Sequence, residues 1–311
     1  TNVDEVDLVN DLVFSSNSNN FLKNSDTSYK FLLRNINTYG DLSNKYKDDK
    51  DYKLFTSFLY NIRYPLFKET NDGSQFLTPL LSFRYSPNKG FNLKNEKELI
   101  RFQDLFNLDR VSNKTIESRE SVTLGLEYKN QNKFNRDRIN LGLGVNLKTK
   151  EDEDLPVSTT LNKKTSDIIG YSGINITENL SIGYNFSIDE NLSDTNYSLA
   201  SLKYNSSIFS TSFEYMEKSQ PIGEESYLNN VSKVIINNNN SLAFETNKNL
   251  DKNLTDYYNL IYKYKNDCLE ASVIYNKQFY SDNAINSDKN IFFKISIIPF
   301  GDVGTVNNEK Y

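Results

Sequence analysis

The stretch Ile139-Asn140-Leu141-Gly142-Leu143-Gly144-Val145-Asn146-Leu147 alternates between two kinds of residue. Every odd position is aliphatic, and every even position is Asn or Gly. Successive side chains of a β-strand point to opposite faces, so this stretch predicts a strand with one apolar face and one polar or open face. The segment from Val122 to Tyr128 alternates in the same way.

Similar segments recur along the whole chain. We expect about fifteen strands of roughly ten residues each, a length that suits tilted membrane-spanning strands better than typical soluble ones. Their predicted starts lie near Leu8, Tyr29, Leu54, Leu77, Val122, Ile139, Ile168, Leu180, Asn196, Ser207, Leu228, Ser241, Leu254, Cys268 and Asn290.

The connections between these segments alternate between short and long, and those at 86–121 and 148–166 are the longest. Outer-membrane barrels have short periplasmic turns and longer outer loops. We therefore predict an all-β, antiparallel, transmembrane outer-membrane β-barrel. Because bacterial single-chain barrels have even strand numbers, an odd count indicates either a count that is wrong by one or part of a larger barrel, and it does not distinguish the two. A large soluble β-sandwich or solenoid is the alternative.

Composition excludes several classes of protein and site. The 311 residues have a mean hydropathy of -0.64 and contain no apolar run near the ~18 residues that a spanning helix needs. A net charge of -5 argues against a nucleic-acid partner. The absence of His removes imidazole-based catalysis and metal binding, so we expect no catalytic site, no metal and no cofactor.

The polar face of the alternating strands supplies the candidate lumen residues, which are Asn140, Gly142, Gly144, Asn146, Glu270 and Ser272. The two glycines remove bulk from that face. They either widen a lumen, accommodate a plug, or allow close packing within the wall.

Charged residues near 150 offer further candidates. The acidic run Glu151-Asp152-Glu153-Asp154 either binds divalent cations or is an ordinary solvated loop, and we favour the loop. Lys148 either meets phosphate groups at the outer rim or is an ordinary surface lysine, which we favour.

Cys268 is the single cysteine, and it follows the tight turn Asn266-Asp267. The loop alternation places it at the periplasmic rim, on the side of Glu270 and Ser272. An accessible thiol in an oxidising compartment tends to form a disulfide, whose partner would have to lie in another segment or protein. A free, incidental thiol is the alternative.

Several stretches resemble the LptD family of lipopolysaccharide-assembly proteins, in its alphaproteobacterial form. The most specific is the block from Tyr257-Tyr258 to Asn266-Asp267-Cys268. The stretches 79–87, 106–110, 120–126 and 292–300 are also similar to family segments, whereas 151–249 matches weakly.

The resemblance implies a barrel of about 26 strands, near the top of the usual range, preceded by a periplasmic domain. Residues 1–311 would then be the C-terminal portion of that barrel, without the N-terminal periplasmic domain. Cys268 matches the family's C-terminal cysteine, which bonds to the N-terminal region. The family's lateral gate lies between its first and last strands, so the stretch 290–300 supplies the gate candidates Phe293, Ile295, Ile297 and Pro299. Pro299, which lacks an N–H, either weakens pairing there or marks the end of the strand.

The implied function is transport of lipopolysaccharide and its insertion into the outer leaflet of the Gram-negative outer membrane, without bond chemistry. The implied partners are lipopolysaccharide, outer-membrane lipid, a plug lipoprotein like LptE, and a periplasmic bridge like LptA that acts through the missing domain. A general porin or substrate-specific channel is the main alternative. An outer-membrane enzyme with a carboxylate-based site and a soluble β-rich surface protein are further rivals.

Overall fold

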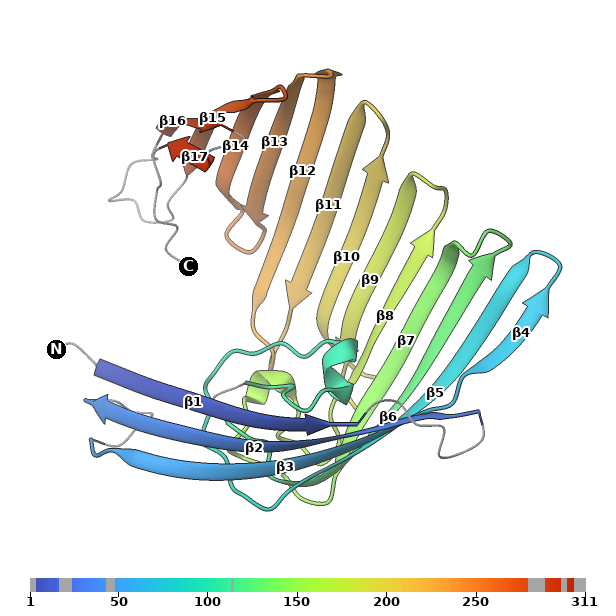
Figure 1. Ribbon diagram of the computed structural model, residues 1–311, viewed down its shortest axis with the longest axis vertical. Coiled ribbons are helices and arrows are strands. Elements are labelled where there is room, and N and C mark those ends of the chain that lie inside the picture. Colours follow the sequence, from blue (N-terminus) through green and yellow to red (C-terminus); the bar gives the residue numbers. More distant parts are fainter. Residues whose placement is uncertain are drawn as a thin grey trace. The chain divides into compact units, whose positions relative to one another are not determined.

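The computed structural model describes residues 4–16, 24–42, 48–112, 115–278, 289–297 and 301–304. Its regular structure is almost entirely β-strand (Figure 1). Among these residues, no helix is long and apolar enough to cross a bilayer. The chain divides into two compact units, of which unit 1 holds 1–173, 185–197 and 219–223, and unit 2 holds 174–184, 198–218 and 224–311.

The strands of the described residues are β1 (Asp4–Ser15), β2 (Asp26–Asp41), β3 (Asp51–Arg63), β4 (Leu66–Thr70), β5 (Gly73–Ser86), β6 (Arg119–Asn132), β7 (Asp137–Lys148), β8 (Ile168–Asn175), β9 (Leu180–Ile188), β10 (Thr195–Asn205), β11 (Phe209–Lys218), β12 (Glu225–Asn237), β13 (Asn240–Asn249), β14 (Leu254–Lys265), β15 (Leu269–Gln278), β16 (Lys289–Ile297) and β17 (Gly301–Gly304). Two short 3-10 helices, η1 (Phe102–Phe106) and η2 (Val157–Thr159), lie in the connections after β5 and β7.

Unit 1 contains an antiparallel meander in which β1 pairs with β2, β2 with β3, β3 with β5, β5 with β6, and β6 with β7. Strand β4 also pairs with β5, in the same register as β3: Arg63 lies opposite Leu80, and Leu66 lies opposite Leu77. The gap between β3 and β4 contains Pro65. Because proline has no N–H to donate to the ladder, β3 and β4 read as one long strand that proline interrupts.

The two faces of the unit 1 sheet differ sharply. On one face, large apolar side chains stand exposed, among them Leu81, Phe83, Leu124, Leu126, Leu141 and Leu143. On the other face, residues of the same strands are buried, such as Leu80, Ser82, Thr123 and Asn146. A contiguous exposed apolar surface of this kind is unusual for a protein in water and is typical of contact with lipid.

Unit 2 contains a second antiparallel meander, which runs in sequence order from β11 to β17. One face exposes Phe213, Phe244, Leu260 and Val273. The opposite face is polar: Asn259 Nδ2 donates to Glu245 Oε2 at 3.1 Å, and Lys263 Nζ lies 2.6 Å from Glu270 Oε1. Unit 2 thus shows the same division into an apolar and a polar face.

The predicted antiparallel, all-β fold is confirmed, and each of the fifteen predicted segments is a strand. The described residues contain two further short strands, β4 and β17, so the predicted count was too low. The alternation of connections is clear in the first half, where the long connections 87–118 and 149–167 alternate with the short turns 133–136 and 176–179. It is weaker later, where 189–194 and 219–224 have six residues each and 250–253 has four, against two or three in the opposing turns 206–208, 238–239 and 266–268.

Candidate functional site: a folded loop layer on the polar sheet face

The described residues of the two long connections, 87–112, 115–118 and 149–167, form what we call the loop layer, which folds onto the buried face of the unit 1 sheet. Their apolar side chains form two clusters with strand residues. The first cluster comprises Ile100, Phe102, Leu105, Leu155 and Leu161 over Leu80 and Ile169. The second comprises Phe91, Leu93 and Ile116 over Leu32, Ile36 and Phe55. Since burial of one such side chain is worth about 1.5–3 kcal/mol, these clusters hold the loops in place.

Hydrogen bonds join the two connections to each other. The backbone N–H of Leu93 donates to Asp154 O at 2.7 Å, and that of Val157 donates to Lys94 O at 3.2 Å. The N–H of Glu98 donates to Ser158 Oγ at 2.9 Å. The loop layer is therefore one structure built from two connections.

A buried cluster of charges fastens the loop layer to the strands. Glu117 accepts two hydrogen bonds from Arg110, at 2.7 and 2.6 Å, and its Oε1 lies 2.8 Å from Lys148 Nζ on β7. Arg84 Nε, on β5, lies 3.6 Å from Glu117 Oε2, and the Arg84 guanidinium also donates to the loop carbonyls of Asn107 and Leu108. These four charged side chains are at most 3% exposed.

The electrostatics of this cluster favour an ionised Glu117. Burial by itself raises the pKa of its carboxyl group, but Arg110, Lys148 and Arg84 lower it by more, and its pKa lies well below the usual range. Arg110 also donates to Asn146 Oδ1 at 2.8 Å and to Thr123 Oγ1 at 3.1 Å. One loop arginine thus connects the carboxylate to β6 and β7.

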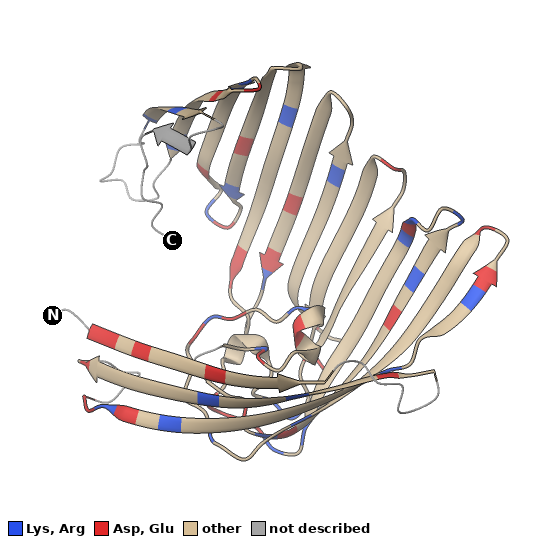
Figure 2. Ribbon diagram, in the orientation of Figure 1, with Lys and Arg blue, Asp and Glu red and all other residues tan. Residues whose placement is uncertain are grey.

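Arg34 on β2 makes a second set of contacts between the strands and the loop layer. The side chain of Arg34 donates to both carboxylate oxygens of Asp11, at 2.8 and 2.6 Å, and to Asp109 Oδ2 at 2.7 Å. It also donates to Thr115 O in the loop at 2.9 Å. Asp11 lies directly opposite Arg34 in the β1–β2 ladder, and Figure 2 shows acidic residues along β1.

Glycines on the covered face make room for aromatic and aliphatic side chains. A Cβ at Gly142 would lie 2.2 Å from the ring of Tyr171, and one at Gly125 would lie 2.5 Å from the ring of Phe106. A Cβ at Gly144 would lie 2.8 Å from Leu105 Cδ1. Gly142 thus leaves room for a side chain of the strand β8, and Gly144 for a side chain of the loop layer.

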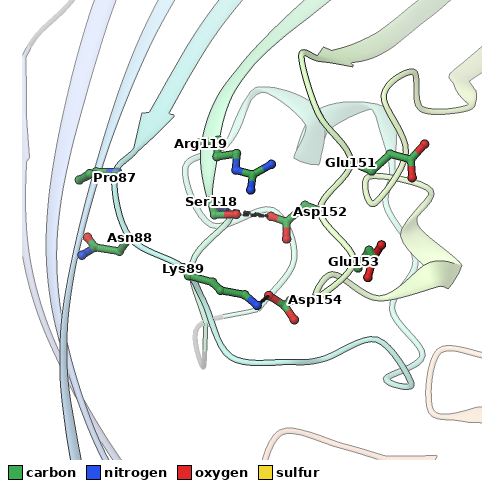
Figure 3. Close-up of a pocket in the computed structure, with 9 residues that line it drawn as sticks. All are labelled: Pro87, Asn88, Lys89, Ser118, Arg119, Glu151, Asp152, Glu153 and Asp154. Atoms are coloured by element: carbon green, nitrogen blue, oxygen red, sulfur yellow. Dashed lines mark hydrogen bonds and ion pairs between the residues drawn. The ribbon is translucent and has the colours of Figure 1, made fainter.

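The acidic run lines a cavity of about 470 Å³ beside the start of β6 (Figure 3). Asp152 accepts a hydrogen bond from Ser118 Oγ at 2.6 Å, and Asp154 pairs with Lys89 at 2.9 Å. Within the described residues, no group of three or more carboxylate or thiol side chains is placed to hold a metal ion. Asp152 is nonetheless buried, so part of the run is built into the loop layer rather than solvated.

A family model described as "LptD: LPS transport system D" matches residues 16–250, which is more than half of the chain. The chain belongs to the LptD family. Membership places it among the proteins of lipopolysaccharide transport and agrees with the resemblance seen in the sequence.

Solved structures of two engineered variants of the Rh. blastica porin are also similar to this LptD-family chain. Each is 9% identical over 88% of this chain and 86% of the porin, with a TM-score of 0.37. Likeness at that level carries no argument for a porin function. No curated protein matches the chain.

The predicted lumen residues fall in two places in this LptD-family chain. On β7, Gly142, Gly144 and Asn146 are buried on the covered face, and Asn140 is half-buried on the same face near the turn 133–136. On β15, Glu270 and Ser272 share the polar face of unit 2, where Ser272 is buried and Glu270 pairs with Lys263.

The last-strand candidates lie on β16, where Phe293, Ile295 and Ile297 are all exposed. The strand β17 follows and pairs with β16, so the stretch predicted as the final strand is not the final one of the described residues. Pro299 lies outside the described residues. Cys268 is exposed and its thiol is free, in the short connection between β14 and β15.

Sequence reasoning missed the buried charge cluster. The prediction of a surface lysine at Lys148 is wrong, since its side chain is 2% exposed and paired with Glu117. The available signal was position: Arg84 lies between Phe83 and Tyr85, and Lys148 follows Leu147 on the same face as Asn146, so alternation assigns both to the covered face. Arg34 gives no such signal, because it lies between Leu33 and Asn35. Which loop residues would meet these basic side chains does not follow from alternation.

Proposed function

We propose that this chain is the C-terminal portion of an LptD-type barrel that transports lipopolysaccharide and inserts it into the outer leaflet of the Gram-negative outer membrane. The family match over residues 16–250 is the observation that carries the proposal. The exposed apolar face and covered polar face of unit 1 support it, because a barrel wall needs one face for lipid and one for a polar interior.

In this proposal the loop layer is an internal plug that closes unit 1 against free diffusion. A plain porin keeps a water-filled interior. Here the polar face is instead covered by folded loops, with Leu105 and Leu161 fully buried. The arrangement suits a transporter that must carry a large amphiphile without leaving an open pore.

The partners in this proposal are lipopolysaccharide, a plug lipoprotein like LptE, and a bridge protein like LptA that acts through an N-terminal periplasmic domain. Lipopolysaccharide would leave at a seam that includes Phe293, Ile295, Ile297 and Pro299. The chain would perform no bond chemistry, and the energy would come from elsewhere in the transport machinery. A seam that opens exposes backbone groups to lipid, so it has to be weakly paired and to open only briefly.

We further propose that Cys268 forms the disulfide that joins the barrel to its N-terminal region. The exposed position of its thiol in a short connection makes the bond sterically accessible. Reduction of this disulfide would change the structure of a transporter tethered in this way, whereas a porin without such a bond would not change.

The test uses the full-length protein in isolated outer membranes, run on gels unheated, with and without reductant. We compare wild type, Cys268→Ser, and the neighbouring control Asp267→Asn. We expect a heat-modifiable, membrane-borne band whose mobility responds to reductant in wild type and Asp267→Asn but not in Cys268→Ser. A band whose mobility changes neither with reductant nor with Cys268→Ser would favour the porin function. A band in the soluble fraction would contradict every hypothesis of a membrane barrel.

A further inference from the structure

A cavity of about 460 Å³ lies against the sheet of unit 1, toward the end of the short turn 133–136. Strands β3, β5, β6, β7 and β8 contribute its main lining side chains, which include Arg63, Phe76, Glu127, Gln131, Asn140 and Tyr171. Its volume is within the range of small-molecule sites. None of these residues belongs to the charge cluster around Glu117.

The charged groups of this cavity neutralise one another. Arg63 Nη2 lies 2.7 Å from Glu127 Oε2, and Lys129 Nζ lies 3.0 Å from Asp137 Oδ1. A free phosphate would have to compete with these carboxylates for both cations. Because the positive and negative charges are paired, the cavity favours an uncharged polar ligand over a small anion.

The remaining groups suit a ligand that is rich in hydroxyls. Gln131 and Asn140 carry side-chain amides, which both donate and accept hydrogen bonds. Asp137, beside the cavity, already orders them by accepting from Gln131 at 2.7 Å and from Asn140 at 3.3 Å. Phe76 and Tyr171 add aromatic surface for the apolar face of a ring.

Tyr171 also connects the cavity to the loop layer. Its ring centroid lies 5.2 Å from that of Phe102 in η1, and it packs against the cluster around Leu105. Gly142 provides the space for the ring, since a Cβ there would lie 2.2 Å from it. A ligand in the cavity would therefore contact a side chain that also supports the loop layer.

We propose that this cavity binds a saccharide unit of the transported glycolipid and that Tyr171 forms one of its walls. The proposal rests on the function proposed above. It assigns a binding site at the turn end of unit 1, below the loop layer, to the sugar portion rather than to the acyl chains.

The test places a photoreactive amino acid at single positions of the full-length protein in cells and detects crosslinked lipopolysaccharide by immunoblot. We expect crosslinks from Asn140 and Gln131, which line the cavity, and several-fold weaker ones from Lys133, which is exposed on the adjacent turn. Position Ile295 on β16 reports separately on the proposed function. Crosslinks from Ile295 without any from Asn140 and Gln131 would overturn the cavity site alone, and none from all three positions would overturn the transport function as well.

Two further experiments test which chemical group binds in the cavity and whether Tyr171 contacts it. In isolated outer membranes, lipid-free core oligosaccharide should reduce the Asn140 crosslink several-fold, whereas inorganic phosphate at the same concentration should not. Reduction by phosphate but not by oligosaccharide would show an anion site and refute the proposal. Tyr171→Phe should retain the crosslink and Tyr171→Ala should lose it, with the heat-modifiable band showing that both are folded; equal crosslinking by the two variants would remove Tyr171 from the site.

Discussion

At the scale of single residues, one carboxylate holds the loop layer to the strands. Glu117 faces Arg110, Arg84 and Lys148, all of them buried. Removing one partner of a buried ion pair costs more than the pair itself contributes, because the remaining charges stay away from water without compensation. Glu117 is therefore the most sensitive polar residue of this cluster.

We expect Glu117→Gln to lower the free energy of unfolding by about 3 kcal/mol, since three cations would lose their shared carboxylate. The measurement is the denaturant concentration at which the folded, heat-modifiable band disappears. Glu98→Gln, on the same connection, is the control, because burial and then Glu96 raise the pKa of Glu98, whereas no cation lowers it. Equal losses for the two variants would contradict the assigned role.

The stabilisation that Glu117 contributes depends on pH, and this dependence follows from the lowered pKa of its carboxyl group. A carboxyl group whose pKa is lower in the folded than in the unfolded protein stabilises fully above the unfolded value of about 4.3, and loses its effect as pH falls through the folded value. The stability difference between wild type and Glu117→Gln should stay constant from neutral pH to about pH 5 and shrink only in stronger acid. A difference that shrinks between pH 8 and pH 6 would assign the stabilisation to another group.

At the scale of elements, glycine positions decide how closely the neighbouring layers approach. On β7, Gly142 meets the Tyr171 ring and Gly144 meets Leu105 of η1. Gly173 on β8 differs, because a Cβ there would find its nearest atom 3.9 Å away. Gly142 and Gly173, in the same sheet, thus differ in whether they tolerate a larger side chain.

We expect Gly142→Ala to destabilise the protein by about 1–3 kcal/mol, the usual cost of overpacking, since the Tyr171 ring would have to move. Gly173→Ala should leave stability nearly unchanged. Denaturant midpoints of the two variants provide the comparison. Adding Tyr171→Leu to Gly142→Ala should recover part of the loss, and a double variant no more stable than Gly142→Ala would show that the clash lies elsewhere.

At the scale of the whole molecule, the sheet of unit 1 has an exposed apolar face and a polar face sealed by the loop layer. The two faces of the sheet follow from one alternating pattern, because each strand sends successive side chains to opposite sides, whereas the covering of one face by loops does not. Under the proposed function, the loop layer is the feature that distinguishes this transporter from an open channel.

We predict that Phe102→Ala with Leu105→Ala will make cells more sensitive to large antibiotics that the outer membrane normally excludes. Deleting these buried side chains removes support from the loop layer, at a cost of several kcal/mol. The measurement is growth inhibition together with the amount of the heat-modifiable barrel band. Leu141→Ala, on the exposed face of β7, is the control, and unchanged sensitivity of the double variant with a normal band would contradict the role of the loop layer as a seal.

The sequence by itself determined the fold class, the approximate strands and the two faces. Period-two alternation is local, so the stretch from Ile139 to Leu147 showed its exposed and its covered side directly. The block that ends at Cys268 pointed to the LptD family, and the family model confirms the family over residues 16–250, a range that does not include the block. The short strand β4, which follows Pro65, was by contrast not predicted.

Only the tertiary structure decided what the long connections do. Their alternation in length gave no sign that 87–118 would fold back onto the sheet, or that Glu117 would meet Arg84 and Lys148 from different strands. Such pairings join residues that are distant in sequence, and they depend on loop-closure and burial energies that no local pattern encodes. A strand repeats the same geometry at every second residue, whereas a folded loop has no repeat, so its contacts are fixed only when the whole unit assembles.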